Sequence, residues 1–180
     1  MKQYVKRLLV VCFFLTSFTV FGQSYLGTVT QAANLREGPG TNYPVLETLP
    51  AGRQVFIYSA EGENDFYKVK VIRTDTDGYI SKSLVALGDV LEEAKEDEIF
   101  LNLSGRTQGD PRLTITNNTS VRLTFTLNSD KYIFAPQETK TLTVPAGRYR
   151  YMASAPLVIP DFGTTNLENN IAYTWVFYLQ

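Results

Sequence analysis

Residues 34–46 read Asn34-Leu35-Arg36-Glu37-Gly38-Pro39-Gly40-Thr41-Asn42-Tyr43-Pro44-Val45-Leu46. The central Gly38-Pro39-Gly40 predicts a tight turn, because glycine adopts positive φ without steric cost and proline fixes its own φ. A short apolar segment begins at Val45, and Pro50-Ala51-Gly52 predicts a second turn soon afterwards. Turns this close together leave room only for short strands, so the stretch predicts a small all-β unit.

Further short strands are expected on both sides of this stretch. Alternating side-chain character indicates strands near 26–30, 55–59, 66–71 and 79–81. Asp77-Gly78 is typical of a hairpin turn, which we expect to join the last two of these strands. Several short strands in about 60 residues indicate a small barrel, which leaves no strand edge unpaired.

The stretch 34–46 resembles the signature of bacterial SH3-like domains. Later landmarks of that family match at Leu49, Gly52, Val55, 66–69 and 78–80. The resemblance extends over residues 26–87, and we place the SH3-like domain at residues 23–87. The resemblance implies a small SH3-like barrel whose ligand is peptidoglycan or a peptide.

Aromatic side chains are frequent in this region. SH3-like folds bind peptides in ring-lined grooves, and tyrosine also suits glycans because it has an apolar face and a hydroxyl. We expect the ligand to contact exposed rings drawn from Tyr43, Tyr58, Tyr67 and Tyr79, with Arg36 as the charged contact. The alternative for these rings and for Phe66 is core packing, and we expect two of the five to be exposed. The family commonly has tryptophan where this chain has Phe66 and Tyr79, which argues against a ligand that depends on an indole face.

Residues 99–180 are predicted to form a second all-β domain. From Val121 to Leu127 apolar and polar residues alternate, which marks a half-buried strand. Near the C-terminus, Trp175 shares a predicted strand face with four other apolar residues, so we expect it to be buried. Frequent turns and six or seven strands predict an antiparallel β-sandwich. The segment 139–153 is loosely similar to small immunoglobulin-like or transthyretin-like modules.

The two predicted domains are separated by an acidic segment, residues 88–98. Asp89 followed by Glu92 fits a capping box, so we expect an acidic linker or a short helix. We also expect few contacts across this joint, with each domain folding independently. A calcium or partner site at residues 96–98 is the alternative use of its charge.

Residues 1–22 have the features of a secretory signal peptide. Three basic residues precede an apolar run over residues 8–15, and the segment ends on the small residue Gly22. The apolar run is shorter than the ~20 residues that a transmembrane helix needs. We therefore expect cleavage after Gly22, export to the periplasm, cell surface or extracellular space, and no membrane span after cleavage. An uncleaved membrane anchor is the alternative.

Composition argues against several classes of function. Cys12 is the only cysteine, and the chain has no histidine. A chain without residues 1–22 therefore cannot form the Ser-His or Cys-His pairs of hydrolases. It also lacks cysteine and histidine as zinc ligands. Such a chain keeps 14 Lys and Arg against 18 Asp and Glu, a net charge of −4 that is unlike a nucleic-acid-binding protein. A pair of catalytic carboxylates across a cleft is not expected in a small sandwich. We expect no enzyme activity, no cofactor and no metal.

The sequence therefore predicts a non-catalytic, exported binding protein of the bacterial cell envelope, with a cell-wall glycan or a peptide as its ligand. The alternative is a structural or assembly protein that docks on an envelope protein through its C-terminal sandwich.

Overall fold

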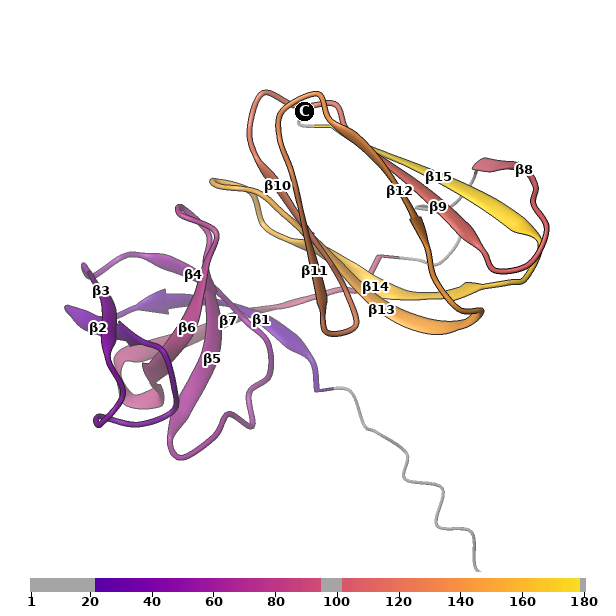
Figure 1. The fold of residues 1–180 in the computed structure, drawn as a ribbon. Helices are drawn as coiled ribbons and strands as arrows, with labels where there is room; N and C mark the ends of the chain where they lie inside the picture. The colour runs from indigo at the N-terminus through magenta and orange to yellow at the C-terminus, as the bar shows by residue number, and fades with distance from the viewer. Residues whose placement is uncertain (1–21, 95–101, 179–180) are drawn as a thin grey trace, which may run out of the picture.

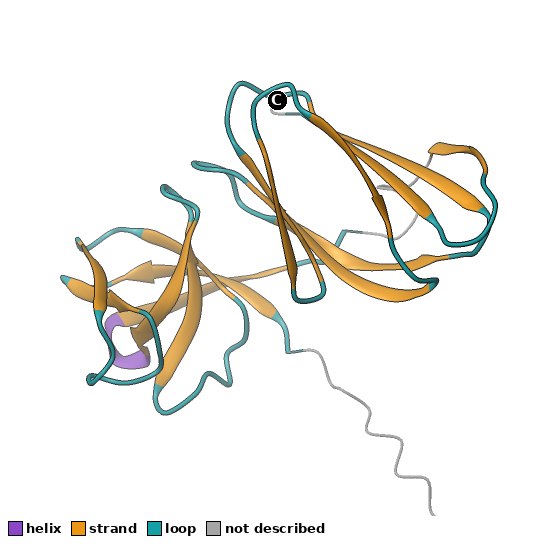
Figure 2. Ribbon diagram, viewed as in Figure 1, coloured by secondary structure: helices purple, strands orange, loops and turns teal. Residues whose placement is uncertain are grey.

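The chain forms two all-β units in the computed structural model, which describes residues 22–94 and 102–178 (Figure 1). Nearly all the regular structure is strand, as Figure 2 shows, and the only helix in these ranges is the short 3-10 helix η1 (Lys82–Leu84). The predicted all-β class is confirmed. Within the described residues no helix is long and apolar enough to cross a membrane. Residues 1–21 of the predicted signal peptide and the acidic residues 96–98 lie outside the described ranges.

One sheet of seven strands makes up the N-terminal unit, in the order β3-β2-β6-β5-β4-β1-β7. Its strands are β1 (Ser24–Val29), β2 (Ala33–Arg36), β3 (Val45–Leu49), β4 (Gln54–Ile57), β5 (Phe66–Val71), β6 (Thr76–Ser81) and β7 (Val85–Leu91). The sheet wraps around a core, but its edge strands β3 and β7 are not paired with each other, so the expected barrel is not closed (Figure 1).

One face of this sheet forms the core, and the other, which we call the outer face, points away from it. Buried side chains that alternate along the strands, among them Leu35, Val55, Ile57, Val69 and Ile80, fill the core. Complete burial of an aliphatic side chain of this size contributes roughly 1.5–3 kcal/mol. Because successive strand residues point to opposite faces, the residues between them belong to the outer face.

The β5–β6 hairpin turns earlier than the sequence predicts. Residues 72–75 form the turn, and Asp75 adopts a φ of 57°, a conformation that aspartate tolerates better than most residues. Gly78 lies inside β6, where an added Cβ would stand 2.6 Å from the side chain of Leu35. The prediction of a turn at Asp77-Gly78 is therefore wrong, and this glycine allows two strands to approach closely.

The C-terminal unit consists of two four-stranded sheets, β11-β10-β13-β14 and β12-β9-β15-β8. Its strands are β8 (Asn102–Arg106), β9 (Arg112–Asn117), β10 (Leu123–Leu127), β11 (Asp130–Phe134), β12 (Thr139–Thr143), β13 (Gly147–Ser154), β14 (Asp161–Leu167) and β15 (Ile171–Phe177). Trp175 is buried, as predicted, and its ring packs edge-on against Phe125 with centroids 5.2 Å apart.

This unit is not purely antiparallel, in contrast to the prediction. The last strand, β15, lies between β8 and β9, pairing antiparallel with the first and parallel with the second. Since β8 and β9 run in opposite directions, a strand inserted between them must be parallel to one.

The start of the acidic segment is strand and not helix or linker. Residues 88–91 belong to β7, which pairs with β1. Beyond β7, the backbone N–H of Ala94 donates to the carbonyl of Phe162 at 2.9 Å, which attaches the joint to β14. Backbone pairing with both units explains the difference from the prediction, because the local acidic pattern contains no information about these distant partners.

The two units pack against each other through the outer face of the N-terminal sheet and the sheet that contains β10 and β14. Phe56 of β4 is fully buried there, and its ring packs edge-on against Phe162 with centroids 5.2 Å apart. The N–H of Leu157 also donates to the carbonyl of Ile72 at 2.7 Å. The expectation of few contacts between the units is wrong, since an aromatic side chain on the outer face of each sheet is buried by the other unit.

Lys70 lies at the centre of this interface and is almost completely buried. Its Nζ atom is 3.1 Å from Asp75 Oδ1 and 3.0 Å from Asp77 Oδ1. The hydroxyl of Thr124 in the C-terminal unit donates to Asp75 Oδ2 at 2.7 Å, and the Tyr58 hydroxyl donates to Asp77 Oδ1 at 2.7 Å. Each carboxylate of the hairpin therefore has a hydrogen bond in addition to its ion pair with Lys70.

The interface changes the protonation equilibria of two of its members. Burial alone would raise the pKa of Asp77, but the charge of Lys70, hydrogen bonds from Tyr58 and Lys70, and the charge of Lys131 together lower it. Burial, and then the neighbouring Asp77, raise the pKa of Tyr58 far above its ordinary value. The phenol therefore remains protonated and continues to donate to the carboxylate.

We expect the substitution Lys70→Met to lower the free energy of unfolding by about 3–5 kcal/mol, because it leaves the buried carboxylate of Asp75 without a cation and removes one of the two cations that pair with the partly exposed Asp77. Lys68→Met is the matched control: Lys68 lies two residues away on the same strand and face but is exposed, so its loss should cost less than about 1 kcal/mol. Chemical denaturation of the whole protein measures both. Equal losses in the two variants would contradict a special role for Lys70.

The lowered pKa of Asp77 predicts a loss of stability in acid. Its contribution is fully present above the unfolded pKa of about 3.9 and is lost as the pH falls through the lower folded pKa. The melting temperature of Asp77→Asn should therefore lie below that of the parent by a constant amount from neutral pH to about pH 5, and the difference should disappear towards about pH 2. Thermal melts followed by circular dichroism give this profile. A difference that persists unchanged in strong acid would contradict the assignment.

Candidate functional site

The outer face of the N-terminal sheet carries its side chains in rows that run across the strands. Phe56 is paired with Lys70, and Lys70 with Asp77, so these three form one row across β4, β5 and β6. The C-terminal unit covers this row through Phe162 and Thr124. It is therefore part of the interface and is not accessible to a ligand.

The next row along the same strands stays accessible. The N–H of Tyr58 donates to the carbonyl of Lys68 at 3.1 Å, Lys68 is paired with Tyr79, and Tyr79 with Arg36. Side chains of paired residues on one face lie about 4.5–5.5 Å apart at Cβ, so the four form a continuous strip. We call Tyr58, Lys68, Tyr79 and Arg36 the exposed row. Lys68 is exposed and the other three are half-buried.

A pocket of about 230 Å³ opens at one end of the exposed row. It is lined by Tyr58, Ser59, Glu61, Gly62, Glu63, Lys68 and Tyr79. The Lys68 Nζ atom lies 5.3 Å from the centre of the Tyr58 ring, a cation–π arrangement that keeps the ammonium at the pocket. The volume lies below the roughly 300–1,000 Å³ of pockets for drug-sized ligands, so it suits one sugar ring or one amino-acid residue of a longer chain.

The loop that walls this pocket has a fixed backbone. Glu63 and Phe66 exchange two backbone hydrogen bonds of 2.8 Å, which close the loop onto the start of β5. The Lys82 ammonium donates to the carbonyl of Glu61 on the same loop. The pocket is therefore formed before a ligand arrives, which reduces the entropic cost of binding.

Tyr43 lies beside the other end of the exposed row. Arg36 Nη1 donates to the carbonyl of Tyr43 at 2.8 Å, and 41 % of the tyrosine surface is exposed. An added Cβ at Gly38 would stand 2.4 Å from the Tyr43 ring, so the glycine of the first turn also allows this ring to lie against the backbone. The row is thus extended by an aromatic ring that is open to solvent.

The structure brings together four of the five residues that the sequence singled out. Arg36, Tyr58 and Tyr79 share the outer face, and Tyr43 is attached to Arg36. Tyr67 is different, because only 7 % of it is exposed and it packs in the core. We therefore remove Tyr67 from the candidate site. Of the five aromatic residues considered, Tyr43 is exposed, Tyr58 and Tyr79 are half-buried, and the other two are buried, where two exposed rings were expected.

Lys68 is the member of the site that sequence reasoning missed. Its signal was present, since it lies between the apolar Tyr67 and Val69 in an alternating strand and so must face away from the core. In the two described ranges, no group of three or more His, Cys, Asp or Glu residues is placed to hold a metal ion.

Comparison with known families supports the interpretation of the N-terminal unit. Residues 31–86 match the family model described as bacterial SH3 domain, and this range contains every residue of the exposed row. Searches of curated proteins and of solved structures gave no significant match. The similarity of residues 139–153 to immunoglobulin-like modules is not confirmed and stays a prediction. Residues 31–86 of this chain are therefore a bacterial SH3 domain.

Proposed function

We propose that this protein is a non-catalytic binding protein of the bacterial cell envelope, and that its SH3 domain binds peptidoglycan or a peptide at the exposed row. Bacterial SH3 domains are generally binding modules, and the family is often involved in cell-wall binding. Export directed by residues 1–22, to the periplasm or the cell surface, is part of the proposal.

The observation that carries the proposal is the division of the outer face. The C-terminal unit covers the row of Phe56, Lys70 and Asp77, and it contacts the neighbouring exposed row at the hydroxyl of Tyr58, leaving the pocket beside that row open. Strand pairing keeps the aromatic rings and the cations of that row adjacent, beside a preformed pocket. Such a combination of rings and charges is typical of a recognition surface.

The chemistry of the exposed row suits the bacterial cell wall. Peptidoglycan offers sugar faces, peptide amides and free carboxylates. Tyrosine rings can cover the sugars, and their hydroxyls can bond to amides. Arg36 lies at the end of the row and can bind a carboxylate through two parallel hydrogen bonds. The area is small, so a few residues should carry most of a modest affinity.

The carboxylates beside the pocket fit binding better than hydrolysis. Glu61 and Glu63 are both exposed. Glycoside hydrolysis needs one carboxyl group whose pKa is raised in a cleft, together with a second across the scissile bond. Their positions suit polar contacts with a ligand's amides or hydroxyls.

We expect the double variant Tyr43→Ala/Tyr79→Ala to reduce retention on purified cell wall at least about tenfold, because it removes one ring from inside the exposed row and the solvent-exposed ring beside Arg36. Tyr58 is left intact, since its hydroxyl belongs to the interface with the C-terminal unit. Co-sedimentation with insoluble cell wall measures retention, and an unchanged circular dichroism spectrum shows that the variant is folded.

Tyr178→Ala is the matched control, because Tyr178 is 60 % exposed but lies outside the SH3 domain. It should sediment like the parent. If the folded double variant also sediments like the parent, the exposed row is not the site. If the parent binds neither cell wall nor short wall peptides, the SH3 domain is a spacer. The alternative of an assembly protein that docks through its C-terminal unit would then take over, and crosslinking in whole envelopes would test it.

A further inference from the structure

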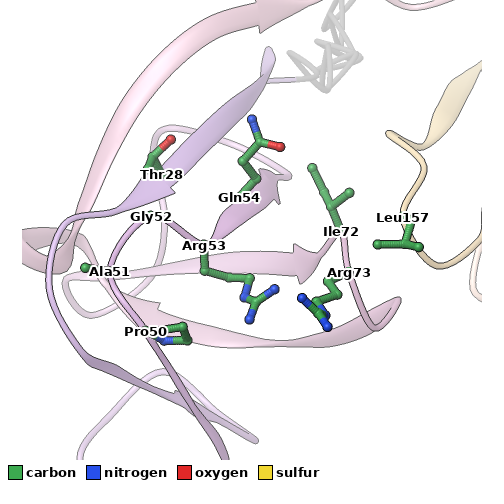
Figure 3. A pocket seen from close by; sticks show the side chains of 9 residues that line it. All are labelled: Thr28, Pro50, Ala51, Gly52, Arg53, Gln54, Ile72, Arg73 and Leu157. Carbon is green, nitrogen blue, oxygen red and sulfur yellow. The ribbon is translucent and has the colours of Figure 1, made fainter.

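Figure 3 shows a second and larger pocket. It lies near the start of β4, whereas the pocket beside the exposed row lies near its end. Gln54, at the start of β4, lines this pocket, whereas Tyr58, just after its end, lines the first; the buried Phe56 lies between them. The cavity has a volume of about 640 Å³ and opens to solvent. This volume is within the roughly 300–1,000 Å³ typical of small-molecule sites.

Two arginines provide the charge of this pocket. Figure 3 shows the side chains of Arg53 and Arg73 directed towards the same part of the cavity, and none of the nine lining residues is acidic. Within the described ranges neither guanidinium forms an ion pair or a side-chain hydrogen bond. The Nε atom of Arg53 is buried and has no acceptor. Two neighbouring cations and a buried unsatisfied donor together indicate a site for an anion.

The rest of the pocket has an apolar wall beside the polar side chains of Thr28 and Gln54. Pro50 and Ile72 contribute to its wall from the SH3 domain, and Leu157 comes from the loop between β13 and β14 of the C-terminal unit. Leu157 is 75 % exposed and has a φ of 68°, a conformation that costs energy for a branched side chain. Its N–H donates to the carbonyl of Ile72 at 2.7 Å, so the interface maintains this conformation. This exposed leucine with a strained backbone lies beside two arginines that have no ion-pair partner among the described residues. The arrangement indicates that a ligand binds the arginines and packs against the leucine.

We propose that this pocket binds a free carboxylate that carries an apolar side chain, as at the C-terminus of a short peptide ending in an aliphatic residue. The guanidinium groups of Arg53 and Arg73 bind the carboxylate oxygens, and the aliphatic group lies against Ile72 and Leu157. Because Leu157 belongs to the C-terminal unit, the site is complete only when the two units are docked. The proposal concerns a separate surface and does not depend on the exposed row.

The test uses the ¹⁵N-labelled protein and three probes: N-acetyl-Ala-Ala-Leu, the same peptide as its C-terminal amide, and inorganic phosphate. We expect the free acid to shift the Nε–Hε signals of Arg53 and Arg73 in a saturable titration, and the amide to bind at least about tenfold more weakly. Arg53→Gln and Arg73→Gln should each weaken binding of the acid about tenfold. Arg122→Gln is the matched control, because Arg122 is exposed on the C-terminal unit, and it should leave binding unchanged.

Two further variants separate the parts of the proposal. Leu157→Ala should weaken binding of N-acetyl-Ala-Ala-Leu but not of N-acetyl-Ala-Ala-Ala, because only the leucine side chain reaches this wall. The variant Tyr43→Ala/Tyr79→Ala should bind the free acid like the parent, which distinguishes this site from the exposed row. Three results would overturn the proposal. They are equal affinity for the acid and the amide, tighter binding of inorganic phosphate than of the acid, and the absence of a saturable shift at millimolar peptide. Trp175 fluorescence verifies that each variant is folded.

Discussion

The ion pairs of buried Lys70 with Asp75 and Asp77 determine how the rest of this structure is arranged. A buried ammonium is tolerated only with close anionic partners, and these carboxylates in turn need donors. Tyr58 supplies one donor from the SH3 domain and Thr124 supplies the other from the C-terminal unit. The network can therefore be complete only when the two units are docked, and their relative position follows from the charges of one hairpin.

Both pockets depend on this network, although they lie near opposite ends of β4. The hydroxyl that donates to Asp77 belongs to Tyr58, whose ring lines the smaller pocket beside the exposed row. The turn that ends at Asp75 contains Ile72 and Arg73, which line the larger pocket. A change in the pairing of the two aspartates would thus affect residues at each site. An aromatic side chain on the outer face, Phe56, completes the same interface by excluding water from it.

The sequence predicts those parts of the fold that depend on local geometry. The turn at Gly38-Pro39-Gly40 could be predicted from its proline and its two small residues, although neither glycine adopts a positive φ. The burial of Trp175 follows from strand alternation, and both signals lie within a few residues. Lys70 and Thr124 could not be placed in this way, because the partner that buries each of them lies in the other half of the chain. Tyr67 was misassigned because it shares the core-facing side of β5 with Val69 and packs in the core. Phe66, on the other face, is buried as well, beside the loop whose Glu63 exchanges backbone hydrogen bonds with it.

The C-terminal unit therefore does more than add a second domain to an SH3 domain. It covers one row of the outer face, contacts the next row only at the hydroxyl of Tyr58, and supplies Leu157 to the larger pocket. A ligand that contacts both units binds the docked arrangement more tightly than the separated one, and so stabilises the interface by mass action. The coupling also acts in the other direction. A change that strengthens the ion pairs of Lys70 raises the population of the docked arrangement, in which the larger pocket is complete. Binding at that pocket and burial of the lysine are thus two consequences of the same docked state.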